Sequence, residues 1–506
     1  MGTLSGYLTY RPDLLNVRNI DIGCLPLLTE MERVGTAINI PGLQSLGVEL
    51  TDSMREYESK IRKHIPVDKL RELLNKPGDN TPPSKDDPDS YSSDKPDDTR
   101  DPDLDKLDLL SGFNVNSSEK VAWLLFDILG LGRGKSLKTS GDGKRISTGK
   151  KQLEMLKDEH EVVGLLLKYR EVSKLKTTYV DKLPKMAVFH NKGLCTVCGL
   201  RHREGTNRIH TQFPTTRTET GRPASRLPNL QNIPARTDLG KRVRANFIPT
   251  PGLKWVSVDE SQIELRALAH CAREETMLQI YRDKKDIHVE TARKSFNLRP
   301  DEPVDPDMHR APSKCINFGI AYGLAAPGLF AQLIFNYHFA SKPVPSWLTE
   351  QWCEEFIERW FSTYPMVRGY MQRIYRMLRR YGFVWNEFGF VRQIHAIWSA
   401  HRHLQSEAER QAGNMPIQGF AAILMKLWMN LVLGTHEGEG YLHEWRELGE
   451  CNPLLTVHDE LNFETDPAIA ELVKEVLAEL VEFIGTELGL LCPLMAEGKV
   501  MDYWKK

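Results

Sequence analysis

The most informative stretch of the chain, residues 309–323, reads His-Arg-Ala-Pro-Ser-Lys-Cys-Ile-Asn-Phe-Gly-Ile-Ala-Tyr-Gly. On a helix, positions four apart share a face, so Arg310, Lys314 and Phe318 would form one stripe, with Tyr322 less strictly in line. Two cations suit a triphosphate, and two flat rings suit a base. By itself, this spacing favours a plainer alternative, an amphipathic core helix that carries two surface charges.

Two acidic clusters lie at the ends or turns of apolar segments that suit β-strands. Asp259 follows residues 253–258, and Asp459 lies within residues 453–463. Carboxylates at the rim of a buried strand are costly unless they are paired or bound to a metal, and Mg²⁺ prefers such oxygen ligands. Carboxylates from two strands could hold two ions about 4 Å apart and so promote phosphoryl transfer. For either cluster alone, an acidic surface turn is the commoner explanation.

The charge of the chain is segregated. The 506 residues, enough for roughly three domains, carry a net charge of −1, with 67 Lys and Arg against 68 Asp and Glu. Residues 79–108 hold eleven Asp and four Lys or Arg, whereas residues 133–151 hold seven Lys or Arg and one Asp. We interpret residues 76–108 as a disordered, solvated loop, with an interaction tail or a DNA mimic as the alternative. The basic loop suits a phosphate backbone, although it could be merely solvated.

Several protein classes are excluded by composition. Hydrophobic residues make up 41% of the chain and charged residues 27%, so a sizeable core is expected. Eight cysteines, of which only Cys195 and Cys198 are close together, argue against a disulfide scaffold and favour a reducing compartment. There is no run of 18 apolar residues and no pattern of a signal peptide at the N-terminus, so we expect no membrane span and no secretion.

Helical periodicity dominates much of the chain. Residues 24–65 predict two helices separated by a turn at residues 39–42. Residues 117–129 predict a helix with Ser117 as its N-cap, and residues 152–179 predict one long helix. The stretch from 264 to 432 is mostly helical in pattern, and the two predicted strands flank it.

Five segments together resemble family A DNA polymerases, the class of bacterial DNA polymerase I. They occur in the order and with the spacing typical of that family, and weaker similarity extends over nearly the whole chain. The segments are Thr220-Gly-Arg-Pro-Ala-Ser-Arg-Leu-Pro-Asn-Leu-Gln-Asn-Ile-Pro234, Asp259-Glu-Ser-Gln-Ile-Glu-Leu-Arg266, the 309–323 stretch, Glu409-Arg-Gln-Ala-Gly-Asn-Met-Pro-Ile-Gln-Gly419 and Val457-His-Asp-Glu460.

The resemblance implies an α+β fold, the right hand of thumb, palm with an antiparallel sheet, and mostly helical fingers. It also implies domain bounds. Residues 1–34 would join palm and thumb, and residues 35–190 would form the thumb, with the acidic insertion 76–108 and the basic tip loop 130–151. The palm would consist of residues 191–266, with a Cys-x2-Cys insertion at 190–207, and residues 411–506, and the fingers would be residues 267–410.

The resemblance also implies a reaction, the template-directed addition of dNTPs to a primer 3′-OH by two-metal phosphoryl transfer. Asp259 and Asp459, with the backbone carbonyl of Glu260, would hold two Mg²⁺ ions, for which Mn²⁺ could substitute. Lys314 would protonate the pyrophosphate, and Glu264 would reject a ribose 2′-OH. The other residues implied to contact the nucleotide are Arg310, Phe318, Tyr322, Gln262 and His288.

Primer-template DNA and dNTPs are the implied partners. The protein would act as a monomer in replication or repair, in the cytoplasm or, if it is phage-encoded, in the cytoplasm of the host cell. The residues implied to contact DNA are Arg222, Asn229, Asn232, Arg410, Asn414, Gln418, His458, Lys150 and Lys151. Only about 20 residues precede the polymerase region, so we expect no proofreading exonuclease. The alternatives are a catalytically inactive DNA-binding relative, and a related polymerase that uses an RNA template or rNTPs.

The chain departs from the family pattern at several positions. Glu260 stands where the family usually has Tyr, which adds a carboxylate near the expected metals. The insertion 190–207 contains Cys195, Cys198 and His202, which could form part of a zinc site whose fourth ligand the pattern does not identify. Plain buried or free thiols are the alternative.

Overall fold

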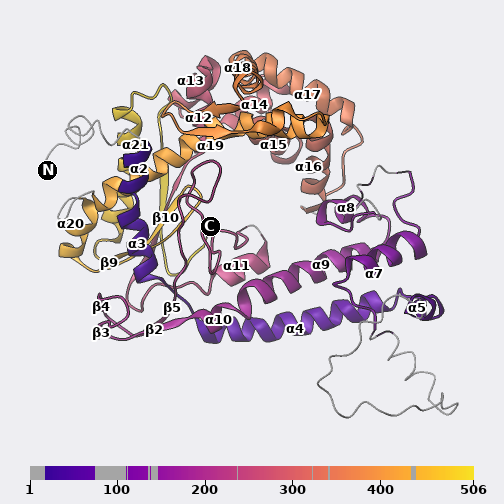
Figure 1. The fold of residues 1–506 in the computed structure, drawn as a ribbon, viewed down its shortest axis with the longest axis horizontal. Coiled ribbons are helices and arrows are strands. Elements are labelled where there is room, and N and C mark those ends of the chain that lie inside the picture. Colours follow the sequence, from indigo (N-terminus) through magenta and orange to yellow (C-terminus); the bar gives the residue numbers. More distant parts are fainter. Residues whose placement is uncertain are drawn as a thin grey trace, which may run out of the picture. The chain divides into compact units, whose positions relative to one another are not determined.

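The computed structural model describes residues 17–74, 110, 112–134, 137, 139, 146–235, 237–321, 323–339, 342–434 and 440–505. The acidic segment 79–108 and Tyr322 therefore lie outside the described residues. The chain divides into two compact units (Figure 1). The larger unit consists of Met1–Gln44 and Tyr179–Lys506, and the smaller unit consists of Ser45–Thr178.

A four-stranded antiparallel sheet in the order β11-β6-β10-β9 carries the acidic clusters of the larger unit. Its strands are β6 (Lys254–Glu260), β9 (Cys451–Val457), β10 (Glu460–Thr465) and β11 (Ala496–Met501). All residues of β9 and β10 are buried, because helices pack on the sheet. Helix α3 (Leu25–Val34) contacts β9, and α21 (Ala470–Glu487) contacts β6 and β11. The strands predicted around Asp259 and Asp459 are confirmed.

The helices between these strands confirm the predicted helical stretch, and Figure 1 shows most of them above the sheet of the larger unit, whereas α20 lies beside β9. They are α12 (Ile263–Ala272), α13 (Glu275–Arg282), α14 (Ile287–Ser295), η4 (Pro306–Arg310), α15 (Ala311–Ala321), α16 (Ala326–Phe339), α17 (Glu350–Thr363), α18 (Pro365–Tyr381), η5 (His395–Trp398), α19 (Arg402–Leu433) and α20 (Tyr441–Leu448).

Helix α19 is the central helix of this unit, since it contacts α2 (Val17–Gly23), α12, α18 and α21. Among the described residues it alone has the length and apolar composition that crossing a membrane would require, but 89% of its most apolar stretch is buried inside the protein. Core helices of folded domains have the same property, because a helix that is apolar all round needs neighbours on every side.

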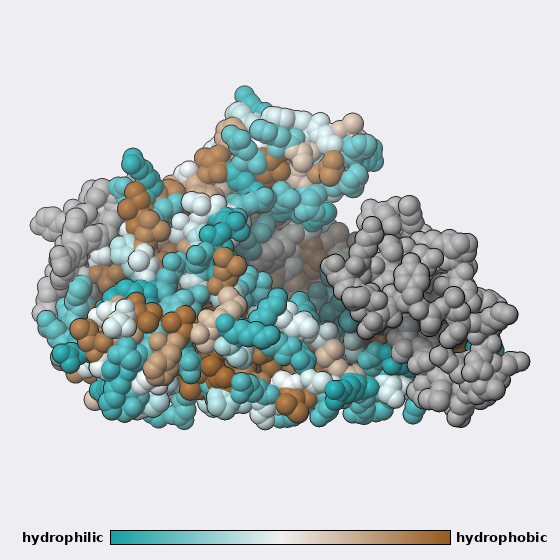
Figure 2. All heavy atoms as spheres, turned by 60° about the horizontal axis from the view of Figure 1, so that its bottom comes forward, coloured by the Kyte–Doolittle hydropathy of each residue, from teal (hydrophilic) through white to brown (hydrophobic). Residues whose placement is uncertain are grey.

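In the part of the chain that the structure describes, short strands make three smaller sheets, in the order β1-β5-β2, β3-β4 and β7-β8. They are β1 (Thr36–Ala37), β2 (Val188–His190), β3 (Gly193–Leu194), β4 (Arg201–His202), β5 (Thr206–Ile209), β7 (Phe383–Trp385) and β8 (Val391–Gln393). Two further short helices of the described residues in this unit are α10 (Leu183–Met186) and α11 (Asp238–Arg244). On the face shown in Figure 2, hydrophilic side chains are interspersed with small groups of hydrophobic ones.

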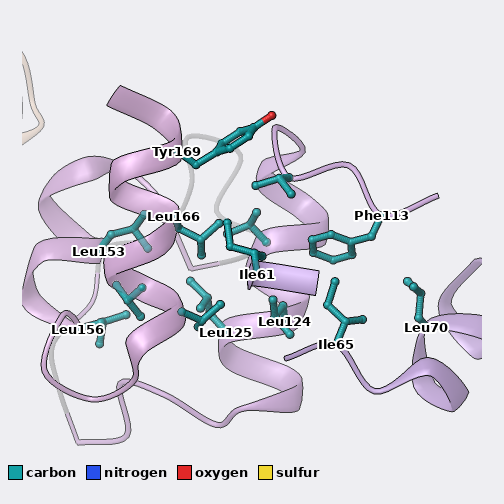
Figure 3. Packing of buried hydrophobic residues seen from close by; sticks show 14 residues of the cluster. Ile61, Ile65, Leu70, Phe113, Leu124, Leu125, Leu153, Leu156, Leu166 and Tyr169 are labelled. Carbon is teal, nitrogen blue, oxygen red and sulfur yellow. The ribbon is translucent and has the colours of Figure 1, made fainter. Parts of the chain in front are cut away.

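The smaller unit has its own hydrophobic core, in which buried side chains point toward one another (Figure 3). Ile61, Leu125, Leu153 and Leu166 are all fully buried there. The elements that the structure describes in this unit are α4 (Ile40–Arg62, from Ser45 onward), α5 (Val67–Leu74), α7 (Ser118–Ala122), η2 (Trp123–Ile128), α8 (Lys150–Met155), α9 (Glu161–Leu175) and the start of η3 (Lys176–Val180).

Two boundary predictions were wrong, and one cap was right. The predicted turn at 39–42 instead begins α4, because Asn39 Oδ1 accepts a hydrogen bond from Gly42 N and a proline is tolerated in a first turn. The predicted helix 152–179 is interrupted between α8 and α9, where the side chain of His160 caps α9 by accepting from Val162 N. Ser117 accepts from Lys120 N, which confirms it as an N-cap.

Candidate active site

The two aspartates predicted to act together lie on neighbouring strands. Asp259 is paired across the sheet with Glu460, the residue directly after Asp459. The backbone N–H of Glu260 donates to the carbonyl of Asp459, with an N···O distance of 2.9 Å. Asp459 stands in the tight turn between β9 and β10, where His458 adopts a positive φ of 57°. Both aspartates are partly exposed, so the register brings two carboxylates to one accessible rim.

The side chain of Glu260 is directed into the protein, since successive residues of a strand face opposite sides of the sheet. It is 4% exposed, and neither carboxylate oxygen has a hydrogen-bond partner among the described residues. Burial, and then the negative charge of Asp459, raise the pKa of Glu260 well above its usual range. The side chain of Glu260 is therefore a buried acid whose neutral form is favoured by burial and by the neighbouring carboxylates.

Arg222 joins three of the predicted segments. Its Nη2 donates to Glu264 Oε1 at 2.8 Å and to Asp459 Oδ1 at 3.0 Å. Glu264 lies in the first turn of α12, and its side chain is only 10% exposed. A single guanidinium thus holds one acid from the sheet turn and one from the adjacent helix. Sequence reasoning expected Arg222 to contact DNA and did not detect this double ion pair.

The predicted stripe is present on η4 and α15. Lys314 is exposed, and Arg310 and Phe318 are partly exposed. The guanidinium of Arg310 is held by Asp286, with distances of 3.1 Å from Nε and 2.7 Å from Nη2 to Oδ2. Burial acts to raise the pKa of Asp286, but Arg310 and the backbone N–H of His288 hold it below its usual range. Sequence reasoning missed Asp286, although an Asp directly before a helix is a typical N-cap.

Asn317 determines which ring nitrogen of His288 carries the proton. Trp360 Nε1, which can only donate, lies 2.7 Å from Asn317 Oδ1, so the amide nitrogen of Asn317 must face His288. That Nδ2 donates to His288 Nδ1 at 3.0 Å, and the ring proton therefore lies on Nε2. Burial lowers the pKa of His288 to about 4, so the ring is neutral near pH 7. The ring also contacts Phe318, with 5.5 Å between the centroids.

Replacing Asn317 by leucine is expected to lower the free energy of unfolding by about 2–4 kcal/mol. The reason is that a side chain of similar size leaves the Trp360 N–H and the His288 Nδ1 buried without a partner. Urea unfolding followed by tryptophan fluorescence measures the change. The matched variant Asn336→Leu alters a partly exposed amide of α16 and should cost less than about 1 kcal/mol. Equal losses in both variants would contradict the role assigned to Asn317.

Other predicted site residues are accessible on the larger unit. Arg410, Asn414 and Gln418 follow one another at four-residue spacing along α19, which places them on one face. Gly323 approaches this face closely, since a Cβ at its position would lie 2.9 Å from Arg410 Cγ. Gln262 precedes α12, and its Oε1 accepts from Tyr281 at 3.1 Å. The remaining exposed residues of the predicted DNA-contacting set in this unit are Asn229, Asn232 and His458.

Lys150 and Lys151 belong to the smaller unit, where they begin α8 and are exposed. The nucleotide contact expected of Tyr322 falls outside the described residues. A pocket of about 640 Å³ lies along α15 and α16, and Lys314, Phe318 and Tyr337 are among the residues that line it. The exposed face of α15 thus combines a cation and a ring beside open space.

A second cluster lies in the larger unit, away from the predicted catalytic residues in the sequence. Cys195, Cys198 and His202 come together as the sequence predicted, and His190 joins them. Sequence reasoning did not identify His190 as the fourth member, although it lies at the start of the same insertion. All four side chains are buried.

The chain is similar to known DNA polymerases. The family model described as DNA polymerase family A matches residues 104–506. The thermostable DNA polymerase I of Thermus aquaticus is 39% identical over 78% of this chain and 42% of its own length. The DNA polymerase I of Bacillus subtilis (strain 168) is 30% identical over 90% of this chain and 42% of its own length. The chain spans less than half the length of these relatives.

Among solved structures, the chain is similar to the POL domain of Pol1 from M. smegmatis in complex with DNA primer-template and dNTP. The match has a TM-score of 0.71 and 26% sequence identity, and it covers 95% of this chain and 69% of that one.

Proposed function

Since the chain belongs to DNA polymerase family A, we propose that it extends a primer 3′-OH by template-directed addition of deoxynucleotides. The observation that carries the proposal is the β6–β10 register, which sets the aspartates of two distant segments side by side. The similarity to a polymerase domain in complex with primer-template and dNTP supports the same partners for this chain.

Asp259 and Asp459 suit divalent cations, because they are partly exposed carboxylates that the β6–β10 register brings to the same rim of the sheet. We assign them, with the backbone carbonyl of Glu260, to two Mg²⁺ ions, for which Mn²⁺ could substitute. When bound, these ions would polarise the attacking and leaving oxygens of the phosphoryl transfer. Arg222 orients Asp459 through the 3.0 Å hydrogen bond and so keeps this carboxylate at the rim.

The residues of η4 and α15 would bind the incoming nucleotide. Lys314 is exposed and would neutralise the triphosphate and donate a proton to the pyrophosphate as it leaves. Arg310 would pair with phosphate while Asp286 holds its orientation. Phe318 would pack on the sugar, and the Nε2–H of His288 is the donor that would be offered to a phosphate oxygen. Gln262 and Tyr322 complete the proposed nucleotide contacts.

We assign residues 35–190 to the thumb, 267–410 to the fingers, and 191–266 with 411–506 to the palm. Residues 1–34 would join palm and thumb. Primer-template contacts are proposed for the exposed amides Asn229 and Asn232, for the face of α19, and for His458 and Arg222. Lys150 and Lys151 would contact the phosphate backbone from the smaller unit, as exposed lysines at a helix N-terminus can.

Primer extension on a defined DNA template tests the proposal. We expect extension with dNTPs and a divalent cation, and far slower extension with rNTPs or on an RNA template. DNA binding without any extension would instead support the inactive DNA-binding alternative. The expectation that a mismatched 3′ end is not degraded stays a prediction, and the same assay without nucleotides checks it.

Replacing Glu264 by alanine is expected to raise the efficiency of rNTP relative to dNTP incorporation by about 10²–10³-fold. The buried carboxylate, held by Arg222, would occupy the space that a 2′-OH requires, and its removal would open that space. Single-nucleotide insertion kinetics with dNTP and rNTP measure the ratio.

The matched control for this substitution is Glu275→Ala, which removes an exposed glutamate from the neighbouring helix α13 and should leave the ratio unchanged. If Glu264→Ala altered dNTP and rNTP insertion by the same factor, Glu264 would not be the residue that discriminates the sugar.

A further inference from the structure

Four side chains form the interior of the insertion around β2, β3 and β4. Of residues 184–205, all of which the structure describes, only His190, Cys195, Cys198 and His202 are buried. Most of the larger apolar side chains of the same segment are exposed, among them Phe189 at 59% and Leu194 at 65%. Apolar burial therefore contributes little to the stability of this insertion, and the four buried side chains are those that commonly bind zinc.

The four potential ligand atoms converge on one point. They all lie within 4.8 Å of one another. Cys198 Sγ is 3.0 Å from His202 Nε2, and His202 Nε2 is 3.4 Å from His190 Nδ1. The ligand atoms of a tetrahedral zinc site lie about 3.3–3.8 Å apart, as its bond lengths require. The cluster thus has nearly the dimensions of a four-ligand zinc site.

Hydrogen bonds to His210 determine which nitrogen of His190 faces the cluster. His210 Nδ1 lies 2.7 Å from the backbone carbonyl of Glu32, an acceptor, so His210 carries its proton on Nδ1. Its Nε2 must then accept from His190 Nε2, which is 2.9 Å away. In the neutral ring of His190, Nδ1 is left without a proton and directs its lone pair at His202 Nε2. Such an arrangement is typical of a metal-binding imidazole whose other nitrogen is hydrogen-bonded outside the site.

The surroundings complete a closed site. His202 Nδ1 has no hydrogen-bond partner among the described residues, and Glu450 Oε1 is 4.0 Å from it, where a carboxylate can orient the ring. The turn that holds the two cysteines is closed by the N–H of Gly199, which donates to Cys195 O at 2.8 Å, and Gly199 adopts the positive φ of 72° that this turn needs. Two thiolates would balance the charge of one Zn²⁺.

We propose that His190 Nδ1, Cys195 Sγ, Cys198 Sγ and His202 Nε2 bind one structural Zn²⁺. The site has four protein ligands, so it stabilises the insertion and has no position for a substrate. It also ties the insertion to the sheet, because Glu450 directly precedes β9 and pairs with Arg203, the neighbour of His202, at 3.3 Å.

The full chain, expressed with added zinc and purified without chelator, is expected to carry about one zinc ion per molecule. Elemental mass spectrometry after gel filtration measures the content. Cys198→Ser is expected to lose at least about nine-tenths of the zinc and to lower Tm by at least about 3 °C. The matched control is Cys353→Ser, which alters a fully buried thiol of α17 and should keep the zinc.

A variant that conserves a metal ligand keeps the test decisive if Cys198→Ser does not fold. His202→Cys should still bind one metal ion, and Co²⁺ in its place should show stronger thiolate-to-metal charge-transfer absorption than in the unaltered chain, because a third sulfur joins the site. A zinc content below about a tenth per chain after incubation with zinc, or an unchanged cobalt spectrum in His202→Cys, would overturn the proposal. Neither measurement depends on polymerase activity, so its failure is distinguishable from failure of the proposed function.

Discussion

Replacing Asp459 by alanine is expected to reduce the rate of primer extension by at least about 10³-fold. The carboxylate stands in the turn between β9 and β10, next to Asp259 on β6. A single aspartate would hold the divalent cations poorly, and the developing charge of the transition state would lose its stabilisation. Single-turnover extension with saturating dNTP measures the rate of the chemical step.

DNA binding separates loss of chemistry from loss of structure in this variant. Removing a negative charge from a surface that meets phosphates should leave the affinity for primer-template equal or tighter, as fluorescence anisotropy at matched salt would measure. The control Asp502→Ala removes an exposed carboxylate that pairs with Lys254 near the far end of β6, and it should extend primers normally. Extension by Asp459→Ala within about tenfold of the unaltered chain would contradict the proposed metal site.

Replacing Lys314 by alanine is expected to slow nucleotide incorporation by about 10²–10³-fold, with a weaker affinity for dNTP. Lys314 is exposed on α15, so its removal should not disturb the fold. The loss has two parts, a missing cation for the triphosphate and a missing proton donor for the pyrophosphate. Pre-steady-state insertion kinetics over a series of dNTP concentrations separate the two.

One variant distinguishes proton donation by Lys314 from electrostatic stabilisation by its positive charge, and a second variant is the control. Lys314→Arg keeps the positive charge but donates a proton poorly, so it should recover dNTP affinity more than rate. Lys294→Ala removes another exposed lysine, from α14, and should change neither. Full recovery of the rate in Lys314→Arg would rule out proton transfer from Lys314, while the electrostatic role would stand.

Much of the fold and part of the site follow from local pattern. The apolar runs around Asp259 and Asp459 predicted β6, β9 and β10, and the stripe of Arg310, Lys314 and Phe318 predicted the accessible face that η4 and α15 share. The family and the α+β fold predicted from five motifs are confirmed. The roles proposed for individual site residues stay predictions, since they concern contacts with a substrate.

The hydrogen bonds that connect site residues to distant partners were not predicted. The bridge from Arg222 to Glu264 and Asp459 joins residues 42 and 237 positions apart. The bond from Trp360 to Asn317 spans 43 positions. Local spacing carries no information on such pairs, because an arginine or an asparagine looks the same whether its partner is water or a buried group.

The amino-acid sequence by itself determined which segments form strands and helices and which residue types they present, since periodicity and capping depend on near neighbours in the chain. Only the tertiary structure decided which of these residues meet. Strand register set Asp259 beside Asp459, and the packing of His210 against Glu32 turned the lone pair of His190 into the cysteine cluster. The physical reason is that register and hydrogen-bond direction arise from contacts between segments far apart in the chain, whereas the periodicity of a sequence reports only on residues that are close together in it.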